Sequence, residues 1–306
     1  MTTDLLPALT AHLTATVHPG NRVCHCPTTT LAAREDATVV RHAGTVAKAH
    51  APDADPTELT RRLTVATRLP GTLLPRSPRP PQHCADASSP AGRTAPPWTR
   101  TTPTPPLGSR GHPPRPPPPH PRPHRRTPMR GPAKAARAIE LLRATAPHHP
   151  ATTPVLDAWA ALPPWARDEA PMPDTTTLCH GDFHLGQLIR HPEHHGWLLI
   201  DVDDLGTGVP EWDLARPAAW YACGLLTPDE WHRFLTAYRA AGGTAVPPAG
   251  DPWTALDVPA RALTAQTAAR SVTKAVAAGR PLDEVERSLV DACARMGSVS
   301  LSSPGS

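Results

Sequence analysis

A proline- and arginine-rich stretch between residues 76 and 128 constrains the fold more than any other feature. It holds 18 of the 43 prolines and nine arginines but a single acid, Asp86. No apolar period of 2 or 3.6 residues continues through it, and such a composition buries too little apolar surface to offset the entropy lost on ordering. We therefore expect a disordered segment, which separates residues 1–75 from residues 129–297. A short disordered tail is expected at 298–306.

The charge of the chain follows the same division. The whole chain carries a net charge of +4, but the stretch from 76 to 128 alone carries +8, which leaves −4 for the rest. The basic residues therefore do not form a patch on a folded surface, and almost no aromatic residues lie between them. A nucleic-acid partner is not expected from this pattern.

Compartment and redox state are indicated by what the sequence lacks. No run of eighteen apolar residues is present, and the N-terminus carries Asp4 without a basic region, so we expect neither a membrane span nor a secretory signal. The six cysteines are scattered, which favours reduced, buried thiols. Cys24 and Cys26 are too close in sequence to suggest a disulfide framework, and one such pair indicates a metal only weakly. We expect a cytoplasmic protein.

Periodicity predicts an α+β chain. In the N-terminal part we expect a helix within residues 1–15 and strands within 28–51, with a hairpin turn at Ala43-Gly44. A second helix should begin after Asp55, with Pro56 at its first position. In the C-terminal part we expect helical segments near 131–147 and 153–170, the second broken at Pro163-Pro164, then a hairpin of 187–190 with 197–201. Four further helices should cover about 212–224, 228–241, 254–279 and 282–296.

Two acids lie at the ends of the predicted hairpin. The segment "HGDFHLGQ" places Asp182 after His180-Gly181, and "LIDVDD" places Asp201 at the end of the partner strand. Gly181 permits a tight turn that presents the acid, and Gln187 begins the first strand. A hairpin brings the start of one strand near the end of the other, so Asp182, Gln187 and Asp201 can converge. An acid for a hydroxyl, with an amide and an acid for Mg²⁺, is what phosphoryl transfer requires.

These motifs, with "VPEWDLA" at 209–215, resemble the aminoglycoside phosphotransferase family. The resemblance implies a protein-kinase-like fold with a small β-containing lobe, here incomplete, and a larger helical lobe. It implies ATP and Mg²⁺ as cofactors, with Asp182 as catalytic base and Asp201 as the main metal ligand. The family pattern is His-Gly-Asp-x-x-x-x-Asn, so Gln187 replaces an asparagine as metal ligand and reaches one methylene further.

The resemblance assigns further residues to the site. Asp213 in "DLA" matches a helix-starting acid that braces the catalytic loop, and His180 should support the loop structurally. Lys48, one of three lysines, lies on the predicted strand that holds the nucleotide phosphates in this fold. Its partner would be Glu58, which is equally explained as a helix-capping residue.

The middle of the chain conflicts with this fold. The remaining small-lobe strands, the adenine-binding hinge and the first large-lobe helix should lie between residues 74 and 129, where the proline-rich stretch stands instead. One hypothesis is a shifted reading frame; the other is a natural linker. The chain is therefore expected to be either an ATP-dependent kinase or a catalytically impaired relative that binds ligand or metal without turnover. A histidine-rich metal-binding protein is a remote third reading.

The acceptor should be a small molecule with a hydroxyl, or an amine, bound by the helices after residue 208. A cationic acceptor would meet acids of this region: Asp204, Glu211, Asp229 and Glu230.

Overall fold

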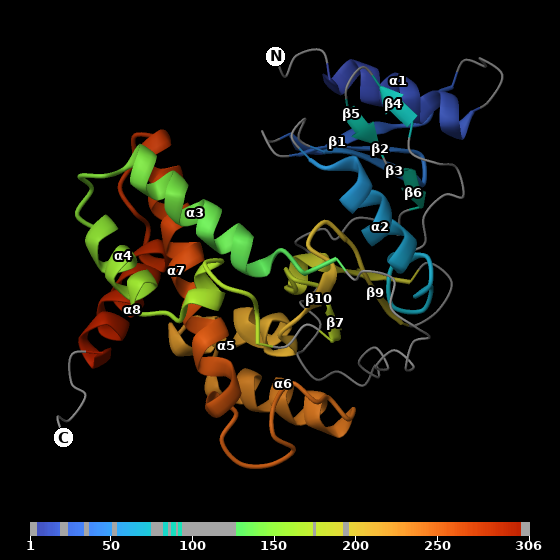
Figure 1. Cartoon of the computed structure of the whole chain (residues 1–306). Coiled ribbons are helices and arrows are strands. Elements are labelled where there is room, and N and C mark those ends of the chain that lie inside the picture. Colours follow the sequence, from blue (N-terminus) through green and yellow to red (C-terminus); the bar gives the residue numbers. More distant parts are fainter. Residues whose placement is uncertain are drawn as a thin grey trace. The chain divides into compact units, whose positions relative to one another are not determined.

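The computed structural model describes residues 5–18, 24–33, 37–50, 54–74, 82–84, 87–89, 91–93, 127–173, 176–191 and 196–300. The chain divides into two units (Figure 1). The N-terminal unit combines Met1–Thr104 with Gly186–Val202, and the C-terminal unit combines Pro105–Leu185 with Asp203–Ser306. It was expected that residues 129–297 would form one part, but the segment 186–202 groups with the N-terminal unit instead.

The N-terminal unit is built on an antiparallel sheet of order β1-β2-β3-β6. Its strands are β1 (Thr28–Ala33), β2 (Ala37–His42), β3 (Thr45–His50) and β6 (Ala91–Arg93). The predicted hairpin is confirmed: β2 pairs with β3 in the register Val39↔Lys48. The turn between them places Ala43 at a φ of +52°, in the left-handed region that tight hairpin turns require.

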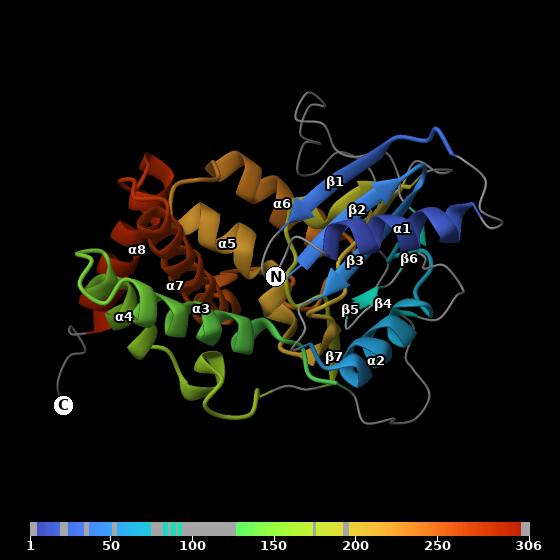
Figure 2. The same ribbon diagram turned by 90° about the horizontal axis from the view of Figure 1, so that it is seen from above.

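Helix α1 (Leu5–Val17) covers this sheet, lying across β2 and β3 (Figure 2). Leu9 and Leu13, one helical turn apart, pack on Val40 of β2 and on Ala47 and Ala49 of β3. The two alanines are separated by two positions and so face the same side of the sheet. This small cluster is the core of the sheet and its helix.

Helix α2 (Pro56–Ala66) begins as predicted. The side chain of Asp55 accepts hydrogen bonds from the backbone N–H groups of Thr57 and Glu58, at 2.7 and 3.3 Å. These contacts satisfy two of the donors that a helix leaves free at its start.

The segment after α2 explains why residues 186–202 belong to this unit. The predicted hairpin forms as β8 (Leu188–Arg190) and β9 (Trp197–Leu199). Leu199 donates its N–H to Thr72 and accepts from Leu74, at 2.8 and 2.9 Å. The hairpin is therefore bonded through its backbone to the chain that follows α2.

The proline-rich stretch was predicted to carry no secondary structure, which is wrong for three short strands. They are β4 (Gln82–Cys84), β5 (Ala87–Ser89) and β6, of which β4 pairs with β5 and β6 with β3. Pairing to an open sheet edge uses backbone groups and needs no apolar side-chain pattern, so periodicity does not reveal it. The remainder of the stretch, where the hinge was expected, lies outside the described residues.

The C-terminal unit is mainly helical. Its elements are α3 (Gly131–Thr145), α4 (Thr152–Ala160), η1 (Pro164–Arg167), β7 (Thr177–Cys179), β10 (Gly206–Gly208), η3 (Pro210–Leu214), α5 (Ala215–Ala222), α6 (Pro228–Ala240), α7 (Trp253–Ala277) and α8 (Glu284–Ser300); η2 (Leu185–Gln187) spans the unit boundary. Helix α7 packs against α3, α4, α5 and α8. It buries many alanines, such as Ala262, Ala265 and Ala269, which let neighbouring helices approach closely.

Helices form in all four segments predicted after residue 208, and α6 begins at the predicted residue, whereas α5 and α8 begin two to three residues later than predicted. Thr227 and Glu230 form a reciprocal capping box at the start of α6. At the start of α8, the N–H of Asp283 donates to the carboxylate of Glu286 and the N–H of Glu286 donates to the carboxylate of Asp283, both at 2.9 Å. Among the described residues, no helix is long and apolar enough to cross a membrane.

Candidate active site

The loop that carries Asp182 follows β7, which pairs with β10 through Cys179↔Gly206. Gly181 has a φ of +84°, and a Cβ atom added there would lie 2.3 Å from the carbonyl oxygen of Asp204. Both the backbone conformation and the space therefore require glycine. This fixes the direction in which the next residue leaves the turn.

One partly buried acid, Asp213, holds the same loop from the other side. The carboxylate of Asp213, in η3, accepts the N–H of His180 at Oδ2 (2.7 Å) and the N–H of Gly181 at Oδ1 (2.8 Å). Burial raises the pKa of Asp213, while the two backbone hydrogen bonds and the nearby His180 oppose the rise. Two parallel bonds to consecutive amides leave the turn little freedom.

Asp182 itself is bound by two cations. Lys134 Nζ donates to Oδ2 at 2.7 Å, and Arg216 Nη2 donates to Oδ1 at 2.7 Å. Burial alone would raise the pKa of Asp182, but the attraction of Lys134 and then of Arg216 outweighs it, so the pKa is lowered. The acid is therefore ionised at neutral pH.

Lys134 connects this acid to a second one. Its ammonium also donates to Oδ2 of Asp204 at 2.7 Å, and the Asp204 side chain is only 8% exposed. Burial lowers the pKa of Lys134, but the attraction of Asp204 and Asp182 is larger in sum and raises it. The lysine thus stays charged between two carboxylates.

His184, two residues after Asp182, is neutral at physiological pH. Burial lowers its pKa to about 4, and the positive charge of Arg216 acts in the same direction. It therefore adds no positive charge to the Asp182 loop at pH 7.

The N-terminal unit brings together Lys48 and Asp201. Lys48 Nζ donates to Oδ1 of Asp201 at 2.7 Å. Asp201 has a φ of +64°, which is uncommon for a residue other than glycine. Such conformations cost energy and concentrate at functional positions.

The predicted ion pair between Lys48 and Glu58 is not formed among the described residues. The carboxylate of Glu58 instead lies 3.0 Å from Arg61 and 3.3 Å from Arg62 on its own helix. Side chains three and four positions apart are neighbours on a helix surface, so local partners take this acid. Glu58 lies in the first turn of α2, whose cap is the side chain of Asp55.

Gln187 is buried, and its backbone carbonyl oxygen accepts the N–H of Ile200 at 2.9 Å. It thus lies beside the residue that precedes Asp201, as the hairpin argument requires. Asp182 belongs to the C-terminal unit, so its convergence with Gln187 and Asp201 stays a prediction.

The sequence of the chain matches a known family over most of its length. The model of the phosphotransferase enzyme family, abbreviated APH, matches residues 29–256. The chain belongs to this family. It is accordingly a small-molecule phosphotransferase, as the resemblance implied.

Solved structures with a similar fold are kinases of small molecules. Choline kinase LicA from Streptococcus pneumoniae has a TM-score of 0.56 and 10% identity, covering 96% of this chain and 99% of that one. Choline kinase from Cryptosporidium parvum has a TM-score of 0.53 and 10% identity, covering 96% of each chain. A thermostable mutant of aminoglycoside phosphotransferase APH(4)-Ia, in ternary complex with AMP-PNP and hygromycin B, has a TM-score of 0.52 and 12% identity, covering 96% and 99%. No curated protein matches the sequence.

Two residues of the candidate site of this phosphotransferase were missed by sequence reasoning. Lys134 and Arg216 both bind Asp182, from α3 and from α5. A signal was available for Lys134, because the chain has only three lysines. Arg216 directly follows "DLA", but arginine is common in this chain and its position alone does not single it out.

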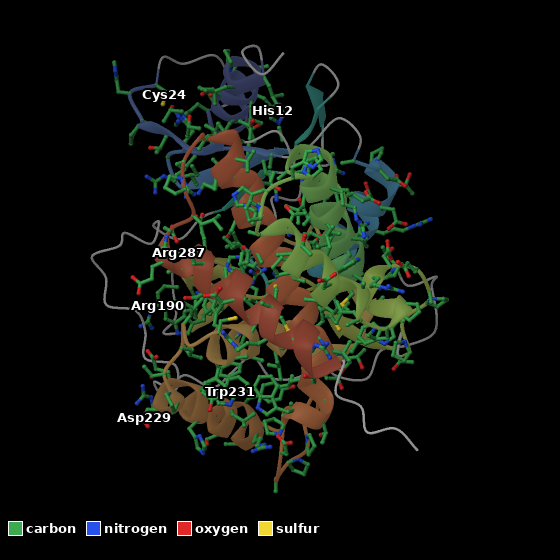
Figure 3. All side chains as sticks on the ribbon, turned by 90° about the vertical axis from the view of Figure 1, so that its left-hand side faces the viewer. His12, Cys24, Arg190, Asp229, Trp231 and Arg287 are labelled. Atoms are coloured by element: carbon green, nitrogen blue, oxygen red, sulfur yellow. The ribbon has the colours of Figure 1, made fainter. Side chains whose placement is uncertain are left out.

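The acids expected to meet a cationic acceptor do not form one group. Asp204 is bound by Lys134, and Glu230 caps α6. Asp229 is exposed on that helix, where Figure 3 labels it with Trp231. Glu211 lines a cavity of about 460 Å³ together with Arg239, Ala255 and residues 242–248. Of the four acids, Glu211 is the one that lines this cavity.

Proposed function

We propose that the chain transfers the γ-phosphate of ATP to a hydroxyl group of a small molecule, or to an amine. The observation that carries the proposal is the state of Asp182: it is ionised, and its loop is fixed by Gly181 and Asp213. Family membership supports phosphotransfer, and the nucleotide analogue AMP-PNP named with one similar structure supports ATP as donor.

In this proposal Asp182 acts on the acceptor. Its carboxylate accepts the hydrogen bond of the acceptor hydroxyl and orients the oxygen toward the phosphorus atom. As the new O–P bond forms, the bond to the departing ADP breaks and the hydroxyl proton passes to Asp182. An acid with a lowered pKa is a weak base, so orientation contributes more than early proton removal.

The donor set of the N-terminal unit fits Mg²⁺ with a nucleotide. Asp201 offers a carboxylate and Gln187 an amide oxygen, the hard oxygen ligands that Mg²⁺ prefers. Lys48 offers an ammonium for the nucleotide phosphates. Mg²⁺ held there would neutralise charge on the phosphate oxygens. Glu58, bound to two arginines, is the least supported member of the proposed nucleotide site.

The cavity at Glu211 supports an acceptor site after residue 208. Its volume of about 460 Å³ is within the range of small-molecule pockets. Arg239 in its wall donates to the carbonyl oxygens of Pro247 and Gly250, at 2.9 and 2.8 Å, so it shapes the wall. An acceptor with an alcohol and a positive group would suit Glu211. We place this reaction in the cytoplasm, because ATP is available there.

One observation favours the alternative function, a catalytically impaired relative that binds ligand without turnover. Both oxygens of Asp182 are bound by cations, and an acceptor hydroxyl must share one of them. If Lys134 and Arg216 keep both carboxylate oxygens occupied, Asp182 cannot bind and orient the acceptor hydroxyl.

The test is ADP release by the full chain with ATP and Mg²⁺, screened over choline-like alcohols, aminoglycosides, sugars and hydroxyl amino acids. We expect turnover with one class, and a loss of kcat of about 10²–10⁴-fold in Asp182→Asn. Asp201→Asn should lose the Mg²⁺ dependence, and Asp291→Asn, at an exposed position on α8, is the matched control. Nucleotide binding without ADP release from any acceptor would establish the impaired relative instead.

A further inference from the structure

Four side chains with metal-binding atoms meet in the N-terminal unit, where Figure 3 labels Cys24. They are His18, Cys24, Cys26 and His42, and their ligand atoms all lie within 4.8 Å of one another. His18 directly follows α1, the two cysteines precede β1, and His42 ends β2. Residues at the end of α1, before β1 and at the end of β2 therefore bring their side chains together.

The contacts are those of two sulfur–nitrogen pairs. Cys24 Sγ lies 3.3 Å from His42 Nε2, and Cys26 Sγ lies 3.5 Å from His18 Nε2. In a tetrahedral zinc site, Zn–S bonds of about 2.3 Å and Zn–N bonds of about 2.0 Å place sulfur and nitrogen about 3.5 Å apart. The pairs already have this separation. We propose that His18, Cys24, Cys26 and His42 form a structural zinc site.

The surroundings orient two of the ligands. The Nδ1 atom of His42 lies 2.8 Å from the hydroxyl oxygen of Thr28, its cross-strand partner in the β1–β2 register. With Nδ1 donating to this hydroxyl, Nε2 keeps its lone pair and faces Cys24. The N–H of Cys26 donates to Cys24 Sγ at 3.1 Å, a contact that stabilises a thiolate. Such second partners fix the orientation of a metal ligand.

The ligand set decides the metal and its role. Two thiolates and two imidazoles suit Zn²⁺ rather than Mg²⁺, which prefers oxygen. Four protein ligands leave no open position for a substrate, as in structural sites. Binding would release the two thiol protons and no other bond would change.

Zinc at this site would stabilise the N-terminal unit. The core beneath α1 consists of five buried residues, two of them alanines. A small core supplies little stability, and metals often compensate for it. Zinc bound by His18, the two cysteines and His42 would fasten the end of α1 and the start of β1 to β2. In the β2–β3 register His42 pairs with Thr45, three residues from Lys48 along the strand, so the role is distinct from phosphate binding.

In the sequence, the pair of Cys24 and Cys26 indicates a metal only weakly. His18 and His42 lie 6 and 18 residues from Cys24, which is not a regular zinc spacing. The strand pairing of β1 with β2 supplies the proximity.

The test is the metal content of the full chain after purification and dialysis, measured by mass spectrometry. We expect one zinc per chain in the wild type and none in Cys24→Ser/Cys26→Ser. His25→Ala removes the exposed histidine between the two cysteines and should keep the zinc. Thr28→Val keeps all four ligands, so it remains informative if the double variant fails to fold. It should weaken zinc affinity tenfold or more, by about the effect of losing a second partner.

Two further readouts test the geometry and the role. Co²⁺ in place of zinc should give the intense visible absorption of a tetrahedral sulfur–nitrogen site. A chelator should lower the Tm of the wild type and of His25→Ala. A wild type without zinc that takes up neither Zn²⁺ nor Co²⁺, or zinc retained by the double cysteine variant, would overturn the proposal. These results do not depend on phosphotransferase activity.

Discussion

The ammonium of Lys134 lies 2.7 Å from Oδ2 of Asp182 and so neutralises the acid of the His-Gly-Asp turn. The same atom binds Asp204 at 2.7 Å. One lysine from α3 thus compensates two poorly exposed carboxylates that lie 22 positions apart. Lys134 is thus the cation that the two carboxylates share, while Arg216 binds Asp182 as a second cation.

Replacing this lysine should affect both stability and the pH profile. In Lys134→Met the carboxylates of Asp182 and Asp204 lose their shared cation, so the free energy of unfolding should fall by up to about 3 kcal/mol. The pKa of Asp182 should rise because the attraction that lowers it is gone. The acid limb of the activity profile should therefore move to higher pH. Urea denaturation and a pH series of kcat measure the two effects.

Two variants serve as controls for this change. Lys134→Arg keeps the positive charge and should keep most of the stability. Lys274→Met removes an exposed lysine from α7 and should leave the acid limb where it is. If Lys134→Met has the same acid limb as the wild type, Lys134 does not set the ionisation of Asp182.

Gly181 offers a test of the turn before the acid. In Gly181→Ala the new Cβ would meet the carbonyl oxygen of Asp204 at 2.3 Å, at a φ of +84°. Gly224 has a similar φ of +74° with nothing within 4 Å of an added Cβ, so Gly224→Ala isolates the conformational cost of about 1 kcal/mol. We expect Gly181→Ala to cost about 2 kcal/mol more than this control and to abolish activity. Equal unfolding free energies for the two variants would contradict the close contact.

Glu286 gives a pH-dependent contribution to stability that is independent of the active site. Its two carboxylate oxygens each lie 2.7 Å from Arg280, and it also accepts the N–H of Asp283. The hydrogen bonds from Arg280 lower the pKa of Glu286 to about 2, from 4.5. A lowered pKa stabilises the fold above the unfolded value, so this contribution is complete above about pH 5 and disappears as the pH falls toward 2.

The measurement compares the wild type with Glu286→Gln by chemical denaturation between pH 6 and pH 2. The difference in unfolding free energy should be constant above pH 5 and vanish near pH 2. Glu284→Gln, an exposed position on the same helix, should show much less of this dependence. A difference that persists at pH 2 would mean that the glutamine disturbs packing rather than charge.

Much of the architecture could be predicted from local patterns. The start of α2 at Asp55, the box of Thr227 with Glu230, and the β2–β3 hairpin all depend on residues within a few positions of one another. Capping and turn formation are local chemistry, so the sequence displays them directly. The family motifs likewise lie in one short segment.

The missed features depend on contacts between distant residues. Lys134 meets Asp182 from 48 positions away, and Arg216 meets it from 34. Strand pairing joins His42 to the cysteines before β1. Neither proximity leaves a periodic trace in the sequence. Glu58 shows the reverse error: a long-range partner was considered where two arginines within four positions were available.

The contact between Lys48 and Asp201 predicts competition between an ammonium and a metal. The two groups lie 2.7 Å apart, so a metal at Asp201 must share or displace the lysine. Lys48→Met should bind Mn²⁺, a probe for Mg²⁺, up to about fivefold more tightly without nucleotide, since a partly exposed ion pair contributes at most about 1 kcal/mol. The same variant should bind ATP about tenfold more weakly, because a charged hydrogen bond to phosphate is lost. Lys48→Arg keeps the charge and should stay close to the wild type in both titrations. Mn²⁺ affinity that falls in Lys48→Met, or that is unchanged in Asp201→Asn, would remove Asp201 from the metal site.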